Sequence, residues 1–405
     1  MSRFIYLDHA ATTPLDPRVF AVMKPWLEEN FGNPSSFHTP GKKAKDAIEA
    51  ARSRVAKIFC CRSEEIIFTS GGTESDNLAV LGLARANAAV GKHVVVSAIE
   101  HHAVLEAAGQ LEKEGFEVTY LKPNSDGIIE FASVKAAIRP DTILVSIMLA
   151  NNEIGAIQPI SEIGNWLQKF RGPKLFPAFH TDACQAAGAL DLSVEKLHVD
   201  LMTINGSKIY GPKGVGALYA RKGLRLQPLM FGGAQERSLR PGTENVASIV
   251  GLAEALDLVQ KEKNKENEHL LPLREKLIKG IFDSVPKTKL NGHPTQRLPN
   301  NVNISFLDIE GEALMLYLDA QGIFVSTGSA CTSASLDPSH VVLATGRSAE
   351  EAHGTIRFTL GHTTTEADID YVLEVLPPLV EKLRLISTNP ITPPFLTPPT
   401  PLNLP

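Results

Sequence analysis

The chain has 405 residues, of which 43% are hydrophobic and 21% are charged, and its formal net charge is −5. This length allows two domains or one large α/β domain with an appendage. The acidic balance, without a cluster of lysine and arginine, argues against a nucleic-acid-binding module. No apolar run approaches the roughly 20 residues that span a bilayer, and we expect no signal or transit peptide at the N-terminus.

The four cysteines, Cys60, Cys61, Cys184 and Cys331, form no disulfide framework and have no zinc-ligand spacing. Free thiols are typical of a reducing compartment. We therefore expect a cytoplasmic protein without a metal site.

From about residue 41 to 285 the pattern alternates between helices and short apolar strands. Residues 41–59 place small and apolar side chains on one helical face. The later apolar runs are mostly continuous, as expected of strands buried on both faces of a mostly parallel sheet. We therefore predict a large, doubly wound, mostly parallel α/β sheet domain over residues 15–260. Its strands would be EIIFTS, HVVVSA, TILVSIMLA, LFPAFHT, VDLMTIN and GVGALYA.

Residues 246–284 predict a long helix that bridges two domains. The segments NNVNISFLD, GTIRFTLG and TEADIDYVLEVLPPLVEKLRLI follow it and mix strands with helices. They predict a smaller α+β domain, formed by residues 1–14 and 261–385. Residues 386–405 are rich in proline and threonine and can hold neither a helix nor a central strand, so we expect a disordered tail.

Polar residues follow five of the predicted strands at the point where each strand ends. Ligands bind outside the carboxyl ends of the strands in open α/β sheets, so these groups predict one shared site. Gly71, Gly72 and Thr73 open a helix whose backbone N–H groups form an anion cradle. No nucleotide P-loop or GxGxxG pattern accompanies this cradle. The other groups are Glu100-His101-His102, Asn151-Asn152-Glu153, His180-Thr181-Asp182 and Asn205-Gly206-Ser207-Lys208.

A phosphate cradle with a lysine and an aspartate nearby indicates pyridoxal phosphate. Lys208 could form the Schiff base, and Asp182 could keep the pyridine nitrogen protonated so that the ring accepts electrons. The alternative for Lys208 is a solvated surface lysine. The glycines of NGSKIYGPKGVGALY favour a site, because they free the backbone where a ligand needs close approach.

Two residues of the C-terminal part also stand out. In STGSACTSAS, Cys331 lies among Ser, Thr, Gly and Ala, which is typical of an exposed loop and not of a core; an ordinary surface turn is the alternative. In TIRFTL, Ile356 and Phe358 share one face and Arg357 takes the other. There Arg357 could bind a carboxylate in bidentate fashion or be solvated.

Eight motifs of this chain resemble, in the same order, those of the cysteine desulfurases, the class V, fold-type I pyridoxal-phosphate enzymes. They are YLDHAATTPLDP, FGNPSS, FTSGGTESDN, ANNEIGAIQP, HTDACQAAG, KIYGPKGVGALY, RPGTEN and GSACTSAS, and the resemblance covers residues 4–385. The Cys331 loop is similar to the long-loop branch that serves iron–sulfur cluster assembly and transfer-RNA thiolation. The resemblance implies a homodimer that removes sulfur from L-cysteine. It further implies that the reaction gives L-alanine and a persulfide on Cys331, which passes to an acceptor protein.

The resemblance also implies roles for individual residues. Lys208 carries the cofactor and removes the α-proton, His101 stacks on the ring and moves protons, and the thiolate of Cys331 attacks the substrate sulfur. Asp182 pairs with the pyridine nitrogen and Gln185 with the phenolic oxygen. The phosphate would be held by Gly72, Thr73, Asn205, Ser207 and, from the neighbouring subunit, Thr243, and the substrate carboxylate by Asn152 and Arg357.

Several positions depart from the family pattern. Ser207 stands where His is common and Asn205 where Ser is common, but both can donate a hydrogen bond to phosphate, so we expect binding to persist. The role of His9 is open, and we expect Cys184 to be a small buried residue. The alternatives to a desulfurase are a selenocysteine lyase, an aminotransferase, or a non-catalytic sulfur-delivery subunit.

Overall fold

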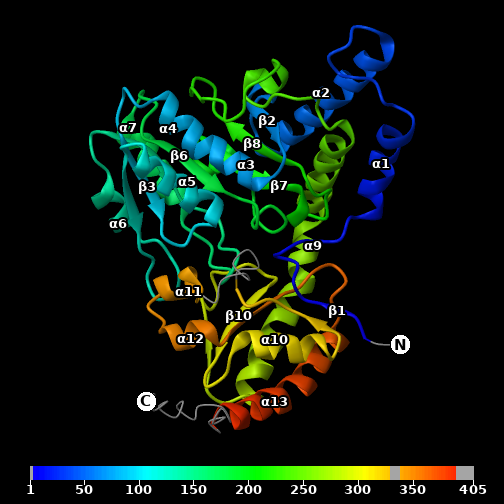
Figure 1. Cartoon of the computed structure of the whole chain (residues 1–405), viewed down its shortest axis with the longest axis vertical. Coiled ribbons are helices and arrows are strands. Elements are labelled where there is room, and N and C mark those ends of the chain that lie inside the picture. Colours follow the sequence, from blue (N-terminus) through cyan, green and yellow to red (C-terminus); the bar gives the residue numbers. More distant parts are fainter. Residues whose placement is uncertain (1–2, 329–337, 389–405) are drawn as a thin grey trace, which may run out of the picture.

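The computed structural model of the chain describes residues 3–328 and 338–388 (Figure 1). The predicted Cys331 site lies outside the described residues, and so does the predicted tail from residue 389 onward. The preceding residues 386–388 belong to the last helix, which ends at Thr388. The helix extends past the expected start of the tail because the first proline of that segment is Pro390.

A seven-stranded sheet forms the larger part of the molecule. All neighbouring pairs are parallel except those of β8, which runs antiparallel to β2 and β7. The predicted fold class, a mostly parallel α/β sheet, is therefore confirmed. In spatial order the strands are β2 (Ile66–Thr69), β8 (Gly216–Ala220), β7 (Leu201–Asn205), β6 (Ala178–Asp182), β5 (Thr142–Ser146), β3 (His93–Ser97) and β4 (Glu117–Leu121).

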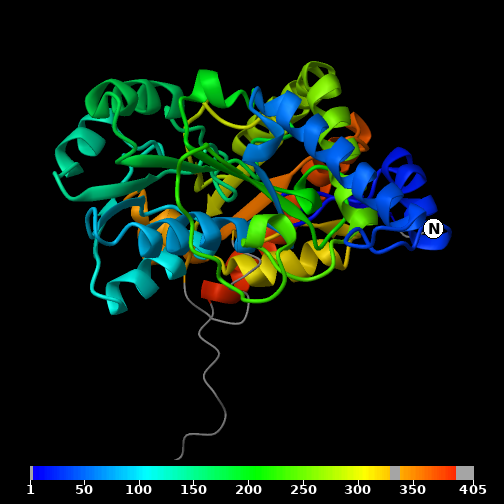
Figure 2. The same cartoon turned by 90° about the horizontal axis from the view of Figure 1, so that it is seen from above.

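Helices cover both faces of this sheet, and α1 and α6 lie at its opposite ends (Figures 1 and 2). Side chains of β3 show why both faces need a cover, because Val95 packs in one apolar cluster and Val94 and Val96 pack in another. The helical segments are α1 (Pro17–Glu28), α2 (Thr39–Phe59), η1 (Ser63–Glu65), α3 (Gly72–Asn77), η2 (Leu78–Gly82), α4 (Leu83–Ala86), α5 (His102–Lys113), α6 (Phe131–Ala137), α7 (Ile160–Arg171), α8 (Val194–Leu197), η3 (Gly206–Lys208) and η4 (Gln235–Ser238).

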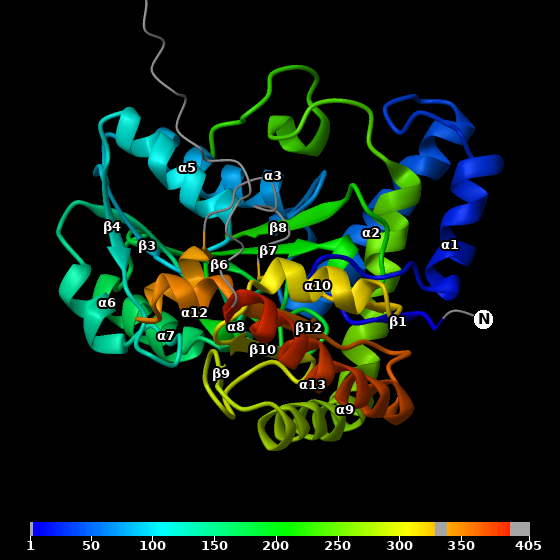
Figure 3. The same ribbon diagram turned by 60° about the horizontal axis from the view of Figure 1, so that its bottom comes forward.

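The long helix α9 (Val246–Ser284) has the bounds that the sequence predicts and runs from the large sheet to a second apolar core (Figure 1). Its first half packs in the core of the large sheet and its second half, from Leu270, in the second core. The start of the chain also belongs there, because Ile5 pairs with Ile323. Figure 3 shows α9, α10 and α13 around this part.

The second core combines two small sheets with α10, α13 and the second half of α9, whereas α11 and α12 pack in a separate small cluster with Ile99 and Ile154. An antiparallel sheet has the order β12-β10-β9, and β1 pairs with β11 in parallel. None of the described helices has the length and apolar character needed to cross a bilayer. The elements are β1 (Ile5–Tyr6), β9 (Thr288–Leu290), β10 (Asn301–Phe306), α10 (Gly311–Asp319), β11 (Ile323–Phe324), α11 (His340–Ala344), α12 (Ala349–His353), β12 (Thr355–Thr359) and α13 (Glu366–Thr388).

Candidate active site

A cavity of about 220 Å³ lies at the carboxyl ends of the parallel strands, where the sequence predicts a site. It brings together residues that are far apart in the chain. Those predicted from the sequence are Gly72, Thr73, His101, Asn152, Asp182, Gln185, Asn205, Lys208 and Arg357, and they are joined by Ala10, Ala11, Asp76, Met148, Ala150 and Cys184.

Lys208 enters the cavity from η3, the short helix that directly follows β7. Its Nζ donates a hydrogen bond to the carbonyl oxygen of Ala11, 2.5 Å away. Asn205 caps η3, since its Oδ1 accepts from both the backbone N and the Oγ of Ser207, each at 3.2 Å. The hydroxyl of Ser207 is thus turned to Asn205, and Ser207 is not among the residues that line the cavity.

Asp182 is the last residue of β6 and is 8% exposed. Its Oδ1 accepts the backbone N–H of Cys184 at 2.8 Å. Cys184 is itself buried, as predicted, and burial followed by the charge of Asp182 raises the pKa of its thiol. Gln185 extends from the same turn and donates from Nε2 to the carbonyl oxygen of Ala10 at 2.9 Å.

His101 is the N-cap of α5, and its Nδ1 accepts the backbone N–H of Ala103 at 3.1 Å. Burial lowers the pKa of His101, which favours the neutral ring. A neutral ring that accepts at Nδ1 carries its proton on Nε2. His101 therefore presents an N–H donor at the cavity.

A layer of buried titratable groups lies under the cavity. His180 contacts the Oγ of Ser146 through Nδ1 at 2.8 Å, and the Oγ1 of Thr203 through Nε2 at 3.2 Å. Burial lowers the pKa of His180 to about 4. Asp76 Oδ1 lies 3.6 Å from His180 Nε2, and burial, followed by the charge of Asp182, raises the pKa of Asp76. His180 is therefore neutral at pH 7, and burial favours the uncharged form of Asp76.

Arg357 lies on β12 and is 2% exposed, while its neighbours Ile356 and Phe358 pack in the second core, as the alternation predicts. Its Nη1 donates to the carbonyl oxygen of Asn152 at 2.9 Å, and its Nη2 to Asp8 Oδ1 at 2.8 Å. In the described part of the chain, nothing accepts a hydrogen bond from its buried Nε. A cation in this position can bind a carboxylate.

Sequence reasoning missed Asp8, Asp76 and Cys184 as members of this site. Asp8 could have been found from its position in the sequence, because it directly follows the apolar run IYL, as the other site residues follow their strands. Of the residues predicted for the site, Thr243 lies elsewhere: it is exposed, next to Gly242 in the loop before α9. Cys331 lies outside the described residues.

His9 belongs to a second, smaller cavity of about 50 Å³, which is also lined by Lys208 and Gln185. His9 is 3% exposed and its Nδ1 donates to the carbonyl oxygen of Thr359 at 2.9 Å. Its Nε2 faces Gly361 so closely that a Cβ on this glycine would lie 2.2 Å away. His9 therefore joins the start of the chain to β12 beside the site.

Comparisons with known proteins identify the family of the chain. The model of the aminotransferase class-V family matches residues 5–372. The chain is 51% identical to the cysteine desulfurase IscS of Dictyoglomus turgidum, over 96% of this chain and 97% of that protein. It is 52% identical to the cysteine desulfurase IscS of Methanosarcina thermophila, over 97% and 95% of the two chains.

Solved structures show the same fold. A NifS-like protein superposes with a TM-score of 0.87 at 36% identity, covering 95% of this chain and all (100%) of that one. DndA from Streptomyces lividans superposes with a TM-score of 0.74 at 39% identity, covering 87% and 99%. This chain belongs to the class-V aminotransferase family and, within that family, to the cysteine desulfurases.

Proposed function

We propose that this protein is a pyridoxal-phosphate-dependent cysteine desulfurase, which converts L-cysteine to L-alanine and holds the released sulfur as a persulfide on Cys331. The observation that carries the proposal is the meeting of Lys208, Asp182 and Arg357 in one cavity. An amine, a carboxylate and a carboxylate-binding guanidinium are the groups that an amino-acid reaction with this cofactor needs. The similarity to proteins named cysteine desulfurase supports the choice of substrate.

The residues of the cavity fit pyridoxal phosphate. A Cβ on Gly72, which lines the cavity, would lie only 3.1 Å from Cys184 Sγ, so glycine keeps this part of the cradle open. The helix that begins at Gly72 continues through η2 and α4 to Ala86, and the first N–H groups of a helix have no partner inside it. Thr73 adds a hydroxyl to this anion site. When bound, the cofactor supplies a sink for the electrons left at the substrate's α-carbon.

The chain's own groups would divide the work as follows. Lys208 Nζ would take the α-proton of the substrate and return it to the α-carbon when L-alanine forms. The N–H on Nε2 of His101 would donate a hydrogen bond in the cavity. Arg357 binds and orients the substrate carboxylate together with Asn152, whose backbone carbonyl already holds the guanidinium. Asp182 pairs with the pyridine nitrogen of the cofactor. The Ala11 carbonyl accepts a hydrogen bond from Lys208 Nζ and so keeps the lysine side chain in the cavity.

Sulfur transfer follows from the thiol chemistry of Cys331. Its thiolate attacks the sulfur of L-cysteine, so that an S–S bond forms and the Cβ–S bond breaks. The electron pair of the broken bond stays on Cβ, which takes up a proton and becomes the methyl group of L-alanine. The proton lost by the Cys331 thiol balances this uptake. The persulfide then passes to an acceptor, an iron–sulfur scaffold or a transfer-RNA-thiolation protein.

A homodimer in the cytoplasm is part of the proposal. Large apolar side chains stand out from the loop between α1 and α2 and from the loop before η4, with Phe31, Phe37 and Phe231 at least 82% exposed. Exposed aromatic residues of this kind support an interface. Thr243 would reach the cofactor phosphate of the second copy from this side. The free cysteines among the described residues support a reducing compartment.

We further propose that the chain has the two domains expected from its sequence, residues 15–260 and residues 1–14 with 261–385. The separate apolar cores on the two halves of α9 support this division.

The test is alanine release from L-cysteine, with a reductant present, by the wild-type protein and by the Cys331→Ala variant. We expect alanine from the wild type and almost none from Cys331→Ala. The matched control is Cys60→Ala, which removes an exposed thiol away from the site and should keep full activity. Equal alanine from Cys331→Ala and the wild type would contradict the proposal in favour of a lyase.

A further inference from the structure

A strained turn precedes the loop that carries Thr243. Glu236, Arg237 and Ser238 have φ values of 40°, 58° and 62°, although none of them is glycine. Side chains make this left-handed region unfavourable, and three such residues in a row persist only where the surroundings force them. Strain of this kind is concentrated at functional sites, so the turn needs an explanation.

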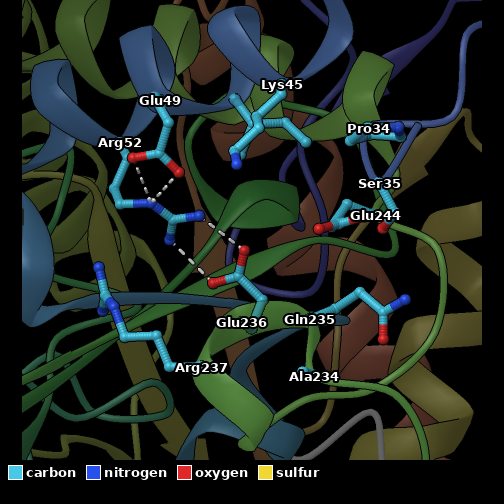
Figure 4. Close-up of a pocket in the computed structure, with 11 residues that line it drawn as sticks. Pro34, Ser35, Lys45, Glu49, Arg52, Ala234, Gln235, Glu236, Arg237 and Glu244 are labelled. Carbon is cyan, nitrogen blue, oxygen red and sulfur yellow. Dashed lines mark hydrogen bonds and ion pairs between the residues drawn. The ribbon is translucent and has the colours of Figure 1, made fainter. Parts of the chain in front are cut away.

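A buried ion pair holds the turn in place (Figure 4). Arg52 on α2 donates from Nη2 to Glu236 Oε1 at 2.7 Å and from Nη1 to Glu236 Oε2 at 2.8 Å. The two side chains are only 6% and 2% exposed. Glu49, one turn earlier on α2, accepts from Arg52 Nε at 3.2 Å. This arrangement is a bidentate pair with little freedom to move.

The turn also completes the edge of the large sheet. β2 is the edge strand, and its Phe68 N–H donates to Glu236 Oε2 at 2.8 Å. The carbonyl oxygen of Ile66 accepts from Arg52 Nη1 at 3.0 Å and from Arg237 Nη1 at 2.9 Å. The consecutive side chains of Glu236 and Arg237 thus both bind the edge of β2. In an extended segment, consecutive side chains would point to opposite sides and could not both do so. The left-handed backbone is what this attachment requires.

On its other side the turn leads to the loop before α9. Arg240 pairs with Glu74 Oε1 at 3.4 Å, and Glu74 Oε2 accepts the N–H of Ser70, at the anion cradle, at 2.7 Å. The N–H of Gly242 donates to Gln235 Oε1 at 3.2 Å. Thr243 follows, with its side chain exposed. A cavity of about 420 Å³ lies beside the turn and is lined by Arg52, Glu236 and Glu244 among others (Figure 4).

We propose that Glu236, held by Arg52, is a positioning residue for cofactor binding in a second copy of the chain. It fixes the strained turn to β2, and the fixed turn sets the place from which Thr243 reaches the phosphate. This inference rests on the proposed function, because it requires a homodimer that binds pyridoxal phosphate.

The test compares how firmly holoenzyme variants keep their cofactor. Purified dimers are dialysed against cofactor-free buffer with graded pyridoxal phosphate, and bound cofactor is read from its absorbance, with light scattering to check the dimer. We expect Glu236→Gln and Thr243→Ala each to raise the dissociation constant about 10- to 100-fold, the effect of losing one hydrogen bond to a charged group. The double variant should bind no more weakly than Thr243→Ala alone, because Glu236 acts through Thr243.

Two controls separate positioning from folding. Asp200→Asn disrupts an equally buried pair, in which Asp200 binds Arg171 and accepts the N–H of Phe179 at 2.8 Å; it should lower the melting temperature and leave cofactor binding unchanged. Ser238→Gly relieves strain and should also bind normally.

Two results would overturn the inference alone: unchanged cofactor binding by Glu236→Gln, or losses that multiply in the double variant. A wild-type protein that is monomeric or takes up no cofactor would instead overturn the proposed function and, with it, this inference.

Discussion

His180 makes the stability of this protein depend on pH in a way that one substitution can isolate. The side chain is fully buried under the site, and burial lowers its pKa to about 4, whereas an unfolded histidine titrates near about 6.5. Between these values the unfolded chain binds a proton that the folded chain does not. The contribution of neutral His180 to the free energy of unfolding is therefore fully present above about pH 6.5 and is lost as the pH falls toward 4.

The size of the effect follows from the two pKa values. Between about pH 7 and about pH 5 the wild type should lose about 2 kcal/mol of unfolding free energy through His180, a large share of the total of about 5–15 kcal/mol. Asp76 and Glu100 act in the opposite direction, because burial raises their pKa values. Both remain in the variant His180→Asn, and burial and the charge of Asp182, the two largest causes of the raised pKa of Asp76, are kept there. Their contributions therefore cancel when the two proteins are compared.

The assay is urea unfolding of the wild type and His180→Asn at both pH values. His180→Asn should be the less stable protein at neutral pH, and its deficit should shrink by about 2 kcal/mol at the lower pH. Asparagine keeps an amide near Ser146 Oγ, which His180 Nδ1 contacts in the wild type. Parallel pH curves for the two proteins would refute the reasoning, since they would mean that His180 titrates alike in the folded and unfolded chains.

Three further predictions follow from contacts of the site and the fold. Arg357→Lys should lower kcat/KM about 10- to 100-fold, mainly through KM, because we propose that the guanidinium binds the substrate carboxylate and a lysine point charge cannot replace a bidentate contact. An unchanged KM in steady-state kinetics would count against this role. Gly361→Ala should lower the free energy of unfolding in urea by about 1–3 kcal/mol, since its Cβ would lie 2.2 Å from His9 Nε2. Adding His9→Ala should restore part of this loss, and a Gly361→Ala variant as stable as the wild type would contradict the contact. In a Cys331→Ala background, a thiol reagent should modify the exposed Cys60 faster than Cys61, whose pKa burial raises to about 12. Adding Cys60→Ser should then remove the faster phase in labelling kinetics, and adding Cys61→Ser should keep it.

Local pattern was enough to predict much of the framework. Continuous apolar runs predict the central strands because strands buried on both faces have no solvent side, and the structure has strands at each of the six runs. The bounds of α9 follow from its unbroken helical pattern. In β12, alternation places Ile356 and Phe358 in the core and Arg357 opposite them. Polar residues after the strands indicated the cavity because parallel strands end at one edge.

The sequence by itself therefore determined the strands, the long helix and the residue types that line the cavity, since each depends on neighbours a few positions away. Only the tertiary structure decided that Asp8 meets Arg357 across 349 positions of the chain. It also decided that burial raises the pKa of Asp76 and lowers that of His180, and that Arg52 holds the strained turn at Glu236. The physical reason is that burial and charge pairing depend on which distant segments are packed together, and a one-dimensional pattern does not contain that information.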